Sequence, residues 1–387
     1  MTKILIVSLV DPATHPGGAG TYTRELVAAL QKGSNGFDVE LVGPLHAPPG
    51  PWCRLRRVVS LAHSCVSKHP AKALFARRHE FRVRIREAVH SRRYDVVLIN
   101  GSDMLWAIDE IPSDMPTVLI AHNLEHQLLA QQLARYHFLS FLLRHEVTKH
   151  RQYEIEGFHR ADGVIFLSAT EMAWSMTQVP DLRAFHVPPL FTSPPASRKP
   201  QSRGQLRLGY LADCAWWPNR QNWLWLIEEV LPNVRRSLQV HAFGRQSELL
   251  PSHHQAILHG RVHDLAAVWD QVDIMVCPIR AGAGVSIKVA ESLYHRMPVL
   301  ATAQAVRGLA CSSGPGLVVI DNAEGWAAFL NSSEADRLAE QGPSAELCEQ
   351  FAVDRYEEQL KHFIVGAARD SESHCSLFGC SPSSETS

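Results

Sequence analysis

The alternation of short apolar segments with amphipathic helical segments is the feature that most restricts the fold of this 387-residue chain. Apolar runs of this length, bounded by turn residues, are typical of buried parallel strands, and apolar residues at helical spacing lie between them. Strands are predicted at 3–9, 37–43, 94–99, 117–121, 162–167, 184–187, 206–211, 238–243, 273–278, 298–302 and 317–320. This order predicts an α/β fold with two doubly wound parallel sheets.

The chain is too long for one ordinary hydrophobic core, so two domains are expected. The segment 192–204, TSPPASRKPQSRG, is rich in Pro, Ser and charge and has no periodicity, which indicates a domain boundary. We expect a Rossmann-like domain at 1–195, a second at 205–350 and a last helix at 351–369. The Ser-rich segment 370–387 has little to bury and is predicted to be disordered.

The charge of the chain is balanced overall but uneven along the sequence. A net charge of −1 gives no argument for a nucleic-acid partner. Between Arg54 and Arg93, however, Lys and Arg are frequent and only Glu80 and Glu87 oppose them. A basic helical stretch favours peripheral contact with an anionic membrane, and the alternative is a solvated face.

Nothing in the sequence predicts a membrane span or an export signal. No apolar run reaches the ~18–20 residues of a spanning helix, and Asp11 and Pro12 directly follow the initial segment 1–10, which favours a strand over a signal peptide. The eight cysteines show no paired CxxC spacing, which favours reduced thiols. We expect a cytoplasmic protein, either free or peripheral at the inner face of the membrane.

The segment GAGVSIKVAES, 282–292, lies between the strands predicted at 273–278 and 298–302. Its glycines therefore follow the carboxyl end of one strand, where open α/β sheets bind ligands, and open a helix whose amide groups suit a phosphate. Glu291 repels phosphate but can accept two hydrogen bonds from a vicinal diol such as ribose. The segment predicts a nucleotide site, and the alternative for Lys288 and Glu291 is a surface pair.

Two further motifs resemble known signatures without fulfilling them. HPGGAGTYT, 15–23, follows the first strand, but its glycines lack the GxGxxG spacing, so a dinucleotide-dependent dehydrogenase is weakly supported. HNLEH, 122–126, matches the HxxEH zinc signature, yet His122 directly ends a predicted strand, whereas that signature requires one continuous helix. We expect no metal here and interpret His122 as a contact to substrate, with a hydrogen-bonded loop histidine as the alternative.

Nearly the whole chain resembles the family-4 glycosyltransferases of the GT-B fold. The segments that carry the resemblance are PGGAGTYTREL, VLIAHNLEHQ, LGYLADCAWWPNRQNWLWLIEEVLP, HGRVHDLAAVWDQVDIMVCPIRAGAGVSIKVAESLYHRMPVLATAQAVRGL and the closing helix. The resemblance implies two Rossmann-like domains facing a cleft, with the closing helix crossing back to the first domain. It also implies a metal-independent, cofactor-free transferase that moves a sugar from a nucleoside-diphosphate sugar to a saccharide or lipid-linked saccharide with retention of configuration, in polysaccharide or glycoconjugate biosynthesis.

The resemblance also implies roles for particular residues. Glu291 would bind the ribose, the amides near 283–285 the diphosphate, the backbone around 261–262 the base, and His122 with the loop 17–20 the reacting sugar. The predicted catalytic residues are His122, Lys288 and Arg280. The predicted donor-binding residues are Gly17, Gly18, Gly20, Gly209, Arg220, Gly244, Arg245, Arg261, Val262, Gly282, Ala283, Gly284, Val285 and Glu291.

The chain departs from the family pattern at two places. Ala283 stands where many members have a second Glu, and the usual Arg and Lys near the first strand of the second domain are missing. Lys288, Arg280, Arg220 and Arg245 are the candidates to replace those cations. Two alternatives to a transferase therefore stay open: a non-catalytic nucleotide-sugar-binding relative, and an epimerase or phosphorylase on the same fold. The sequence identifies neither the donor sugar nor the acceptor.

Overall fold

The computed structural model describes residues 1–13, 15, 17–45, 51–134, 137–196, 204–262, 264–282, 284–310 and 313–377. Within these ranges, the side chains of 51, 52, 54, 134, 137–142 and 369–377 are not described. The chain forms two compact units. The first comprises Met1–Asp11, Val27–Val187 and Tyr356–Ser387, and the second comprises Pro12–Leu26 and Pro188–Arg355.

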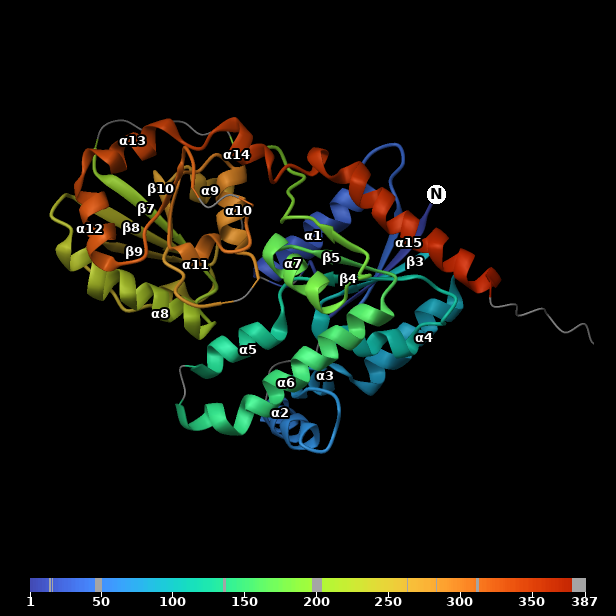
Figure 1. Ribbon diagram of the computed structural model, residues 1–387. Coiled ribbons are helices and arrows are strands. Elements are labelled where there is room, and N and C mark those ends of the chain that lie inside the picture. The colour runs from blue at the N-terminus through green and yellow to red at the C-terminus, as the bar shows by residue number, and fades with distance from the viewer. Residues whose placement is uncertain are drawn as a thin grey trace, which may run out of the picture. The chain divides into compact units, whose positions relative to one another are not determined.

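The first unit contains a six-stranded parallel sheet in the order β2-β1-β3-β4-β5-β6. Strands β3, β4 and β5 of this sheet are labelled in Figure 1. Its strands are β1 (Lys3–Ser8), β2 (Asp38–Val42), β3 (Val96–Asn100), β4 (Thr117–Ala121), β5 (Gly163–Phe166) and β6 (Ala184–His186). Its helices are α2 (Pro51–Ser64), α3 (Ala71–Ala76), α4 (His79–Ser91), η1 (Ser102–Glu110, a 3₁₀ helix), α5 (Glu125–Ala134), α6 (His137–Arg160), α7 (Ala169–Gln178) and α15 (Glu357–Leu377). Helix α1 (Gly18–Gln31) begins in the second unit and ends in this one.

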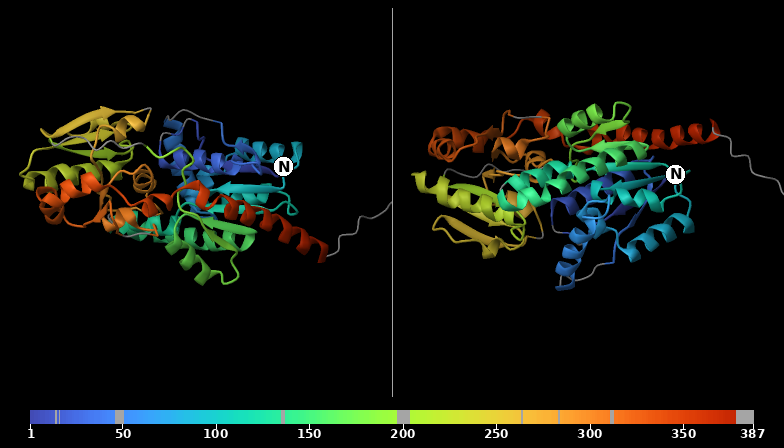
Figure 2. Two further views of the ribbon diagram at one scale, coloured as in Figure 1. Left: turned by 90° about the horizontal axis from the view of Figure 1, so that it is seen from above. Right: turned by 60° about the horizontal axis from the view of Figure 1, so that its bottom comes forward.

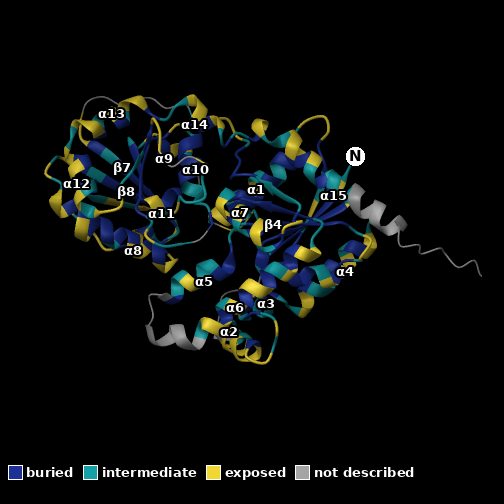
Figure 3. Ribbon diagram, viewed as in Figure 1, coloured by how far each residue is buried: buried dark blue, intermediate teal, exposed yellow. Residues whose placement is uncertain are grey.

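The core of the first unit lies between the sheet and its helices. All residues of β3 and β4 are buried, as parallel strands covered on both faces are (Figure 3). Phe81 of α4 meets Trp106 of η1 edge to face, with ring centroids 5.6 Å apart. Helix α15 contacts β3 and β4 and lies along this unit in the further views (Figure 2). The Arg183 guanidinium fixes α15 by donating to the carbonyl oxygen of Phe363 at 3.1 Å.

The second unit contains a six-stranded parallel sheet in the order β12-β11-β10-β7-β8-β9. Its strands are β7 (Leu206–Leu211), β8 (Leu238–Phe243), β9 (Ala256–Gly260), β10 (Ile274–Cys277), β11 (Val299–Ala301) and β12 (Leu317–Val319). Its α-helices are α8 (Trp217–Trp225), α9 (Ala266–Trp269), α10 (Ile287–Tyr294), α11 (Ala303–Val306), α12 (Ala323–Asn331), α13 (Ser333–Gln341) and α14 (Ala345–Glu349). Helix α8 continues into a π turn, η2 (Leu226–Val230), and three short 3₁₀ helices follow at η3 (Leu231–Asn233), η4 (Ser247–Leu249) and η5 (Val353–Arg355).

Tryptophans organise the core of the second unit. Trp225 and Trp326 are nearly perpendicular, with ring centroids 5.3 Å apart. The indole N–H groups of Trp223 and Trp326 donate to the carbonyl oxygens of Pro251 and Ile320, at 3.0 and 2.7 Å. These bonds satisfy the polar edge of each buried ring, so the large apolar area is buried without an unpaired donor.

The predicted fold class is confirmed, since two parallel sheets with flanking helices are present. One strand, β9, was missed because it is an edge strand whose short, partly exposed sequence AILHG lacks a continuous apolar run. Residues 197–203 of the predicted domain boundary at 192–204 lie outside the described residues. Of the tail at 370–387, which was predicted to be disordered, the structure describes only the backbone up to Leu377, at the end of α15. Among the described residues, no helix is both long and apolar enough to cross a membrane.

Candidate functional site

The strand order of the second sheet reverses between β7 and β10. In open α/β sheets, ligands bind beyond the carboxyl ends of the strands at such a topological switch point. The chain leaves β7 into the segment 212–216 and then α8, and it leaves β10 into the glycine turn and then α10. The predicted nucleotide motif therefore begins at the switch point of its sheet.

The glycine turn is held by side chains from α11 and the residue after it. Gly282 and Gly284 both have positive φ, 152° and 71°. The Arg307 guanidinium donates to the carbonyl oxygens of Gly282 and, at 2.5 Å, Gly284, and Gln304 Nε2 donates to Gly282 at 2.8 Å. Because the C=O and N–H of one planar trans peptide point in opposite directions, the bond to Gly284 directs the N–H of Val285 away from Arg307.

The predicted donor-binding glycines of the second sheet have different surroundings. A Cβ built on Gly282 has no atom of the described residues within 4 Å, so open space borders the turn. By contrast, a Cβ on Gly209 would lie 2.5 Å from Met275 Sδ, and one on Gly244 would lie 2.1 Å from the carbonyl oxygen of Ala212. Packing alone therefore requires glycine at 209 and 244, whereas the turn at 282 allows a ligand to approach its backbone.

Lys288 is in the first turn of α10 and is half-buried. Its Nζ lies 3.4 Å from Oδ1 of Asn219, and Asn219 is fixed by a bond from its Nδ2 to the carbonyl oxygen of Asp213 at 2.8 Å. Burial lowers the pKa of Lys288, against the opposing effect of the Cys277 and Cys214 thiols. The Lys288 ammonium group is partly desolvated, and among the described residues its hydrogen-bond acceptor is the neutral amide of Asn219. A bound anion would therefore stabilise its charged form.

Glu291 lies one turn further along α10 and is 8% exposed. Burial, and then the charge of Glu25, raise its pKa to about 7, while Arg24 opposes the shift. Glu25 is itself held by the backbone N–H and the hydroxyl of Thr192, both at 2.7 Å. The ionised carboxylate of Glu291 is therefore poorly solvated, and hydrogen bonds from a ligand, such as those of two hydroxyl groups, would stabilise it.

The other predicted cations either pair with carboxylates or lie on the exposed surface. Arg245 makes a bidentate pair with Asp213, at 3.0 and 2.7 Å. Arg280 lies 3.7 Å from Glu229 and over the ring of Trp225. Arg220 and Arg261 are exposed and Val262 is half-buried, and Ala283 lies outside the described residues. The turn, Lys288 and Glu291 thus follow one another from β10 into α10, and of the four candidate cations Lys288 is half-buried whereas Arg220, Arg245 and Arg280 are exposed.

The glycine loop at 17–20 also belongs to the second unit. A Cβ on Gly18 would lie 3.2 Å from the Cβ of Ile287, the first residue of α10. A Cβ on Gly20 would lie 2.3 Å from the carbonyl oxygen of His15, and the N–H of Gly17 donates to Nδ1 of His15 at 3.2 Å. Gly18 therefore lets the start of α1 pack closely on the first residue of α10, while Gly17 and Gly20 let their own loop close tightly around His15.

In the first unit, polar side chains end three adjacent strands. Asn100 follows the apolar part of β3, donates to Ser8 Oγ of β1 at 3.1 Å, and lies with Oδ1 at 2.6 Å from Nε2 of His122, directly after β4. Burial lowers the pKa of His122 to about 4; Asp103 opposes this shift and Lys72 adds to it. His122 is therefore a neutral hydrogen-bonding group at pH 7, set at the carboxyl edge of its sheet.

A second polar cluster lies beside His122. Lys72 of α3 pairs with Asp103 of η1 at 3.2 Å and with Glu125 of α5 at 2.7 Å. Although burial opposes both shifts, the carboxylates hold the pKa of Lys72 above its ordinary range, and Lys72 lowers the pKa of Asp103. These ion pairs tie α3 to η1 and α5, the helices that follow β3 and β4.

The HNLEH segment does not form the helix that its zinc interpretation requires. His122 follows β4, α5 starts only at Glu125, and Nδ1 of the buried His126 lies 2.6 Å from the Glu154 carboxylate. The backbone N–H of Glu125 donates to the same carboxylate at 2.6 Å. Over the part of the chain that the structure describes, no group of three His, Cys, Asp or Glu side chains could hold a metal ion.

Sequence analysis missed several residues that shape the site. Arg307 holds the glycine turn, and Asn219 contacts Lys288. Glu25 raises the pKa of Glu291, and Asn100 orients His122. All four act across the fold; Arg307, for example, lies 25 residues after Gly282. The only sequence signal was that Asn100, like His122, ends a predicted buried strand of the same sheet, where polar residues of neighbouring strands meet.

Comparisons with known proteins agree with this geometry. The pattern of the family "Glycosyltransferase Family 4" matches residues 16–205, and that of "Glycosyl transferases group 1" matches residues 205–333. None of the curated proteins compared with the chain matches it in sequence.

Solved structures share the fold at low identity. Sucrose-phosphate synthase from Thermosynechococcus elongatus is 14% identical with a TM-score of 0.62, over 98% of this chain and 100% of that one. HepE from Anabaena, in complex with UDP-glucose, is 14% identical with a TM-score of 0.61, over 95% and 100%. TarM is 12% identical with a TM-score of 0.55 over 74% of this chain, which spans 58% of the length of TarM.

The two family patterns together run from residue 16 to residue 333, and the two parallel sheets are those of GT-B structures. The chain therefore belongs to the family-4-like, group 1 glycosyltransferases of the GT-B fold.

Proposed function

We propose that this glycosyltransferase moves a sugar from a nucleoside-diphosphate sugar to a hydroxyl group of a saccharide or lipid-linked saccharide, with retention of configuration and without a metal ion. Its product would enter a polysaccharide or glycoconjugate. The observation that carries the proposal is the group formed by the braced glycine turn, Lys288 and the buried Glu291 at the switch point of the second sheet. Solved relatives support it, since HepE was solved with UDP-glucose and S. aureus TarM with UDP and alpha-GlcNAc-glycerol.

The donor is assigned to this group by its chemistry. The Glu291 carboxylate accepts hydrogen bonds from both ribose hydroxyls, which offsets the burial that raises its pKa. The N–H of Val285 and the ammonium group of Lys288 meet the diphosphate, since both favour negative charge at the start of a helix. The backbone at 261–262 is assigned to the base.

Transfer breaks the bond between the sugar and the phosphate, so negative charge builds up on the departing diphosphate. A fixed cation and oriented amides stabilise that charge without reorganising, which lowers the barrier. The departing phosphate oxygen takes the proton of the acceptor hydroxyl, which attacks the sugar from the same face. The neutral ring of His122 donates or accepts a hydrogen bond at the transferred sugar but adds no charge, because its pKa is about 4.

A panel of nucleotide sugars, each with and without saccharide acceptors, tests the proposal. Release of nucleoside diphosphate that depends on acceptor, with the anomeric configuration of the product retained by NMR and activity unchanged by a chelator, supports it. Lys288→Gln is expected to lower turnover by about tenfold or more, as for the loss of a charge-assisted hydrogen bond, and Arg337→Gln, at an exposed position of α13, serves as control. Sugar interconversion, or tight binding without turnover, would instead favour an epimerase or a non-catalytic relative.

A further inference from the structure

Helix α2 (Pro51–Ser64) presents apolar side chains to solvent. Leu55, Val58 and Val59 are 51%, 64% and 56% exposed, and Val66, just after the helix, is 88% exposed. Together with the exposed Ala62, these residues follow the spacing of one helical face. We call this set the α2 stripe. Amphipathic surface helices normally bury such a face against the core, so the α2 stripe lacks its usual partner among the described residues.

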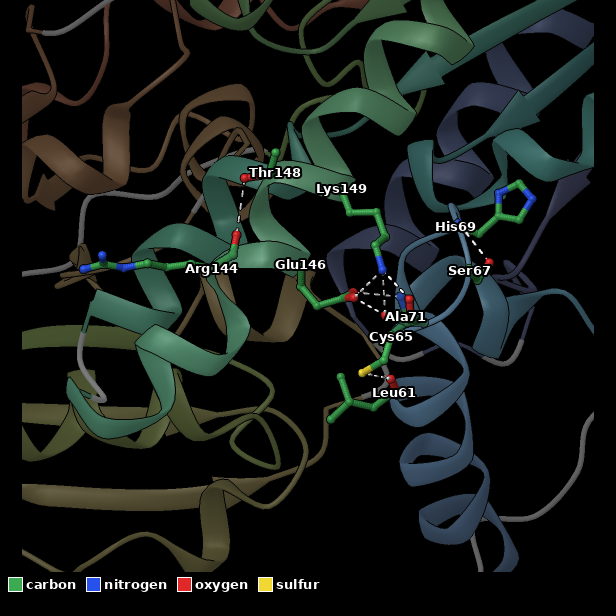
Figure 4. A network of polar contacts seen from close by, with 10 residues as sticks. Leu61, Cys65, Ser67, His69, Ala71, Arg144, Glu146, Thr148 and Lys149 are labelled. Carbon is green, nitrogen blue, oxygen red and sulfur yellow. Dashed lines mark hydrogen bonds and ion pairs between the residues drawn. The ribbon is translucent and has the colours of Figure 1, made fainter.

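The orientation of α2 is fixed by its opposite side, at its C-terminal end (Figure 4). The buried Ser64 donates to Glu146 of α6, and Lys149 of α6 donates to the Ser64 carbonyl oxygen and lies 3.3 Å from Glu146. Glu146 also accepts from the N–H of Ala71 at 2.9 Å. This buried network ties the polar side of α2 to α6, and turning the helix inward would remove the Ser64 hydrogen bonds from the buried Glu146 and Lys149, which is costly.

Several cations of the basic stretch 54–93 have carboxylate partners within the fold. Three arginines surround the buried Glu110, Lys72 pairs with two carboxylates, and Arg92 pairs with two more. The arginines around Glu110 are Arg77, Arg82 and Arg86. These five cations are therefore held beside carboxylates of the fold.

The cations near α2 are different, because the sequence from 51 to 79 contains no Asp or Glu. Arg57 and Lys68 are exposed, and the Arg56 guanidinium lies 5.2 Å from the ring centroid of Phe75. Apolar side chains thus protrude in the one part of the basic stretch that has no carboxylate nearby in sequence. An apolar face with cationic flanks is the pattern of helices that lie in the interface of anionic membranes.

We propose that α2 docks this protein on an anionic lipid bilayer, with the α2 stripe in the boundary between headgroups and acyl chains and with Arg57 and Lys68 on lipid phosphates. Lipid fits the surface better than a second copy of the chain does. A symmetric contact through the same face would place these cations near their own copies, where like charges repel. Anionic lipid instead attracts each of them.

Vesicle cosedimentation of the full chain tests this docking. Vesicles of about three parts phosphatidylcholine to one part phosphatidylglycerol are expected to bind the protein, and binding is expected to weaken in about 0.5 M salt, where exposed charges are screened. The double variant Val58→Ser, Val59→Ser is expected to lose about tenfold or more of its partitioning, since less apolar surface enters the lipid. Leu249→Ser, which removes an apolar side chain of similar exposure (59%) from the other unit, is the matched control.

Each result has a definite meaning once circular dichroism shows that the variants are folded. Loss of partitioning in the stripe variant and in Arg57→Gln, but not in Leu249→Ser, supports the proposal. Equal partitioning of all variants, or no binding at low salt, overturns it. A wild-type dimer seen by light scattering that becomes a monomer in the stripe variant would show that a second copy covers the stripe, and would also overturn it. Donor turnover in vesicle-free buffer is a separate readout, so failure here leaves the proposed function standing.

Discussion

Replacing Glu291 by Gln is expected to stabilise the second unit, by an amount that depends on pH. Burial moves the pKa of Glu291 from its ordinary 4.5 to about 7. At 1.36 kcal/mol per pKa unit, ionising this carboxylate in the folded protein costs about 3 kcal/mol. Below pH 4.5 the group is protonated whether the chain is folded or unfolded, and the cost is absent. As pH rises through 7 the full cost appears, so wild-type stability falls over this range. Glutamine has a similar shape and no charge, so it avoids the cost.

Calorimetric scans at pH 5 and pH 8, without nucleotide, measure the effect. For a unit of this size, 3 kcal/mol corresponds to a rise in Tm on the order of 6–12 °C, so Glu291→Gln is expected to melt at a clearly higher temperature than wild type at pH 8. At pH 5 the two proteins are expected to melt within a few degrees of each other. Glu228→Gln, at an exposed position, is the control and is expected to change Tm little at either pH. A gain from Glu291→Gln that is the same at both pH values would refute the assignment of a desolvated carboxylate.

Three further predictions concern ligand binding and turnover. His122→Ala is expected to lower turnover more than affinity for the nucleoside diphosphate of the donor that the panel identifies, while His126→Ala mainly lowers Tm because Glu154 loses the His126 ring as a partner; equal losses of activity in kinetic assays would contradict this. Arg307→Lys, which cannot form the fork that holds two carbonyl groups, is expected to weaken binding of that nucleoside diphosphate about tenfold by calorimetry, and unchanged affinity would show that Arg307 is not needed to hold the turn. The same affinity is expected to fall from pH 8 to pH 6, as Glu291 takes up a proton, and a pH dependence that persists in Glu291→Gln would show that another group is responsible.

The fold was predictable because its signals are local. Continuous apolar runs such as VVLIN and TVLIA become fully buried parallel strands, and their alternation with helices allows few other topologies. Strand β9 escaped prediction because an edge strand needs only one buried face and its sequence shows no continuous run. The sequence also did not indicate that Pro12–Leu26 belongs to the second unit, because its packing with Pro188–Arg355 depends on contacts far apart in the sequence.

The candidate site was predictable only in part, for the same physical reason. Lys288 and Glu291 follow a glycine turn within one β-α-β segment, so a single stretch of sequence shows both. The four candidate cations could not be ranked, because whether Arg245 and Arg280 already have carboxylate partners depends on Asp213 and Glu229. By contrast, the sequence already indicated that the HNLEH residues do not share one helix, because His122 directly follows a predicted strand, and α5 indeed starts only at Glu125.

The second unit has a consequence for protein engineering, because its residues are not continuous in the chain. The segment Pro12–Leu26 contributes Gly18, which packs on Ile287, and Glu25, which binds Thr192. A fragment that begins at residue 188 would leave the start of α10 uncovered and Thr192 without its acceptor. Chimeras that exchange donor specificity between relatives therefore need two grafts, the short segment at 12–26 together with the long one at 188–355. A single crossover in the linker would join a nucleotide site to a partner segment with which it did not evolve.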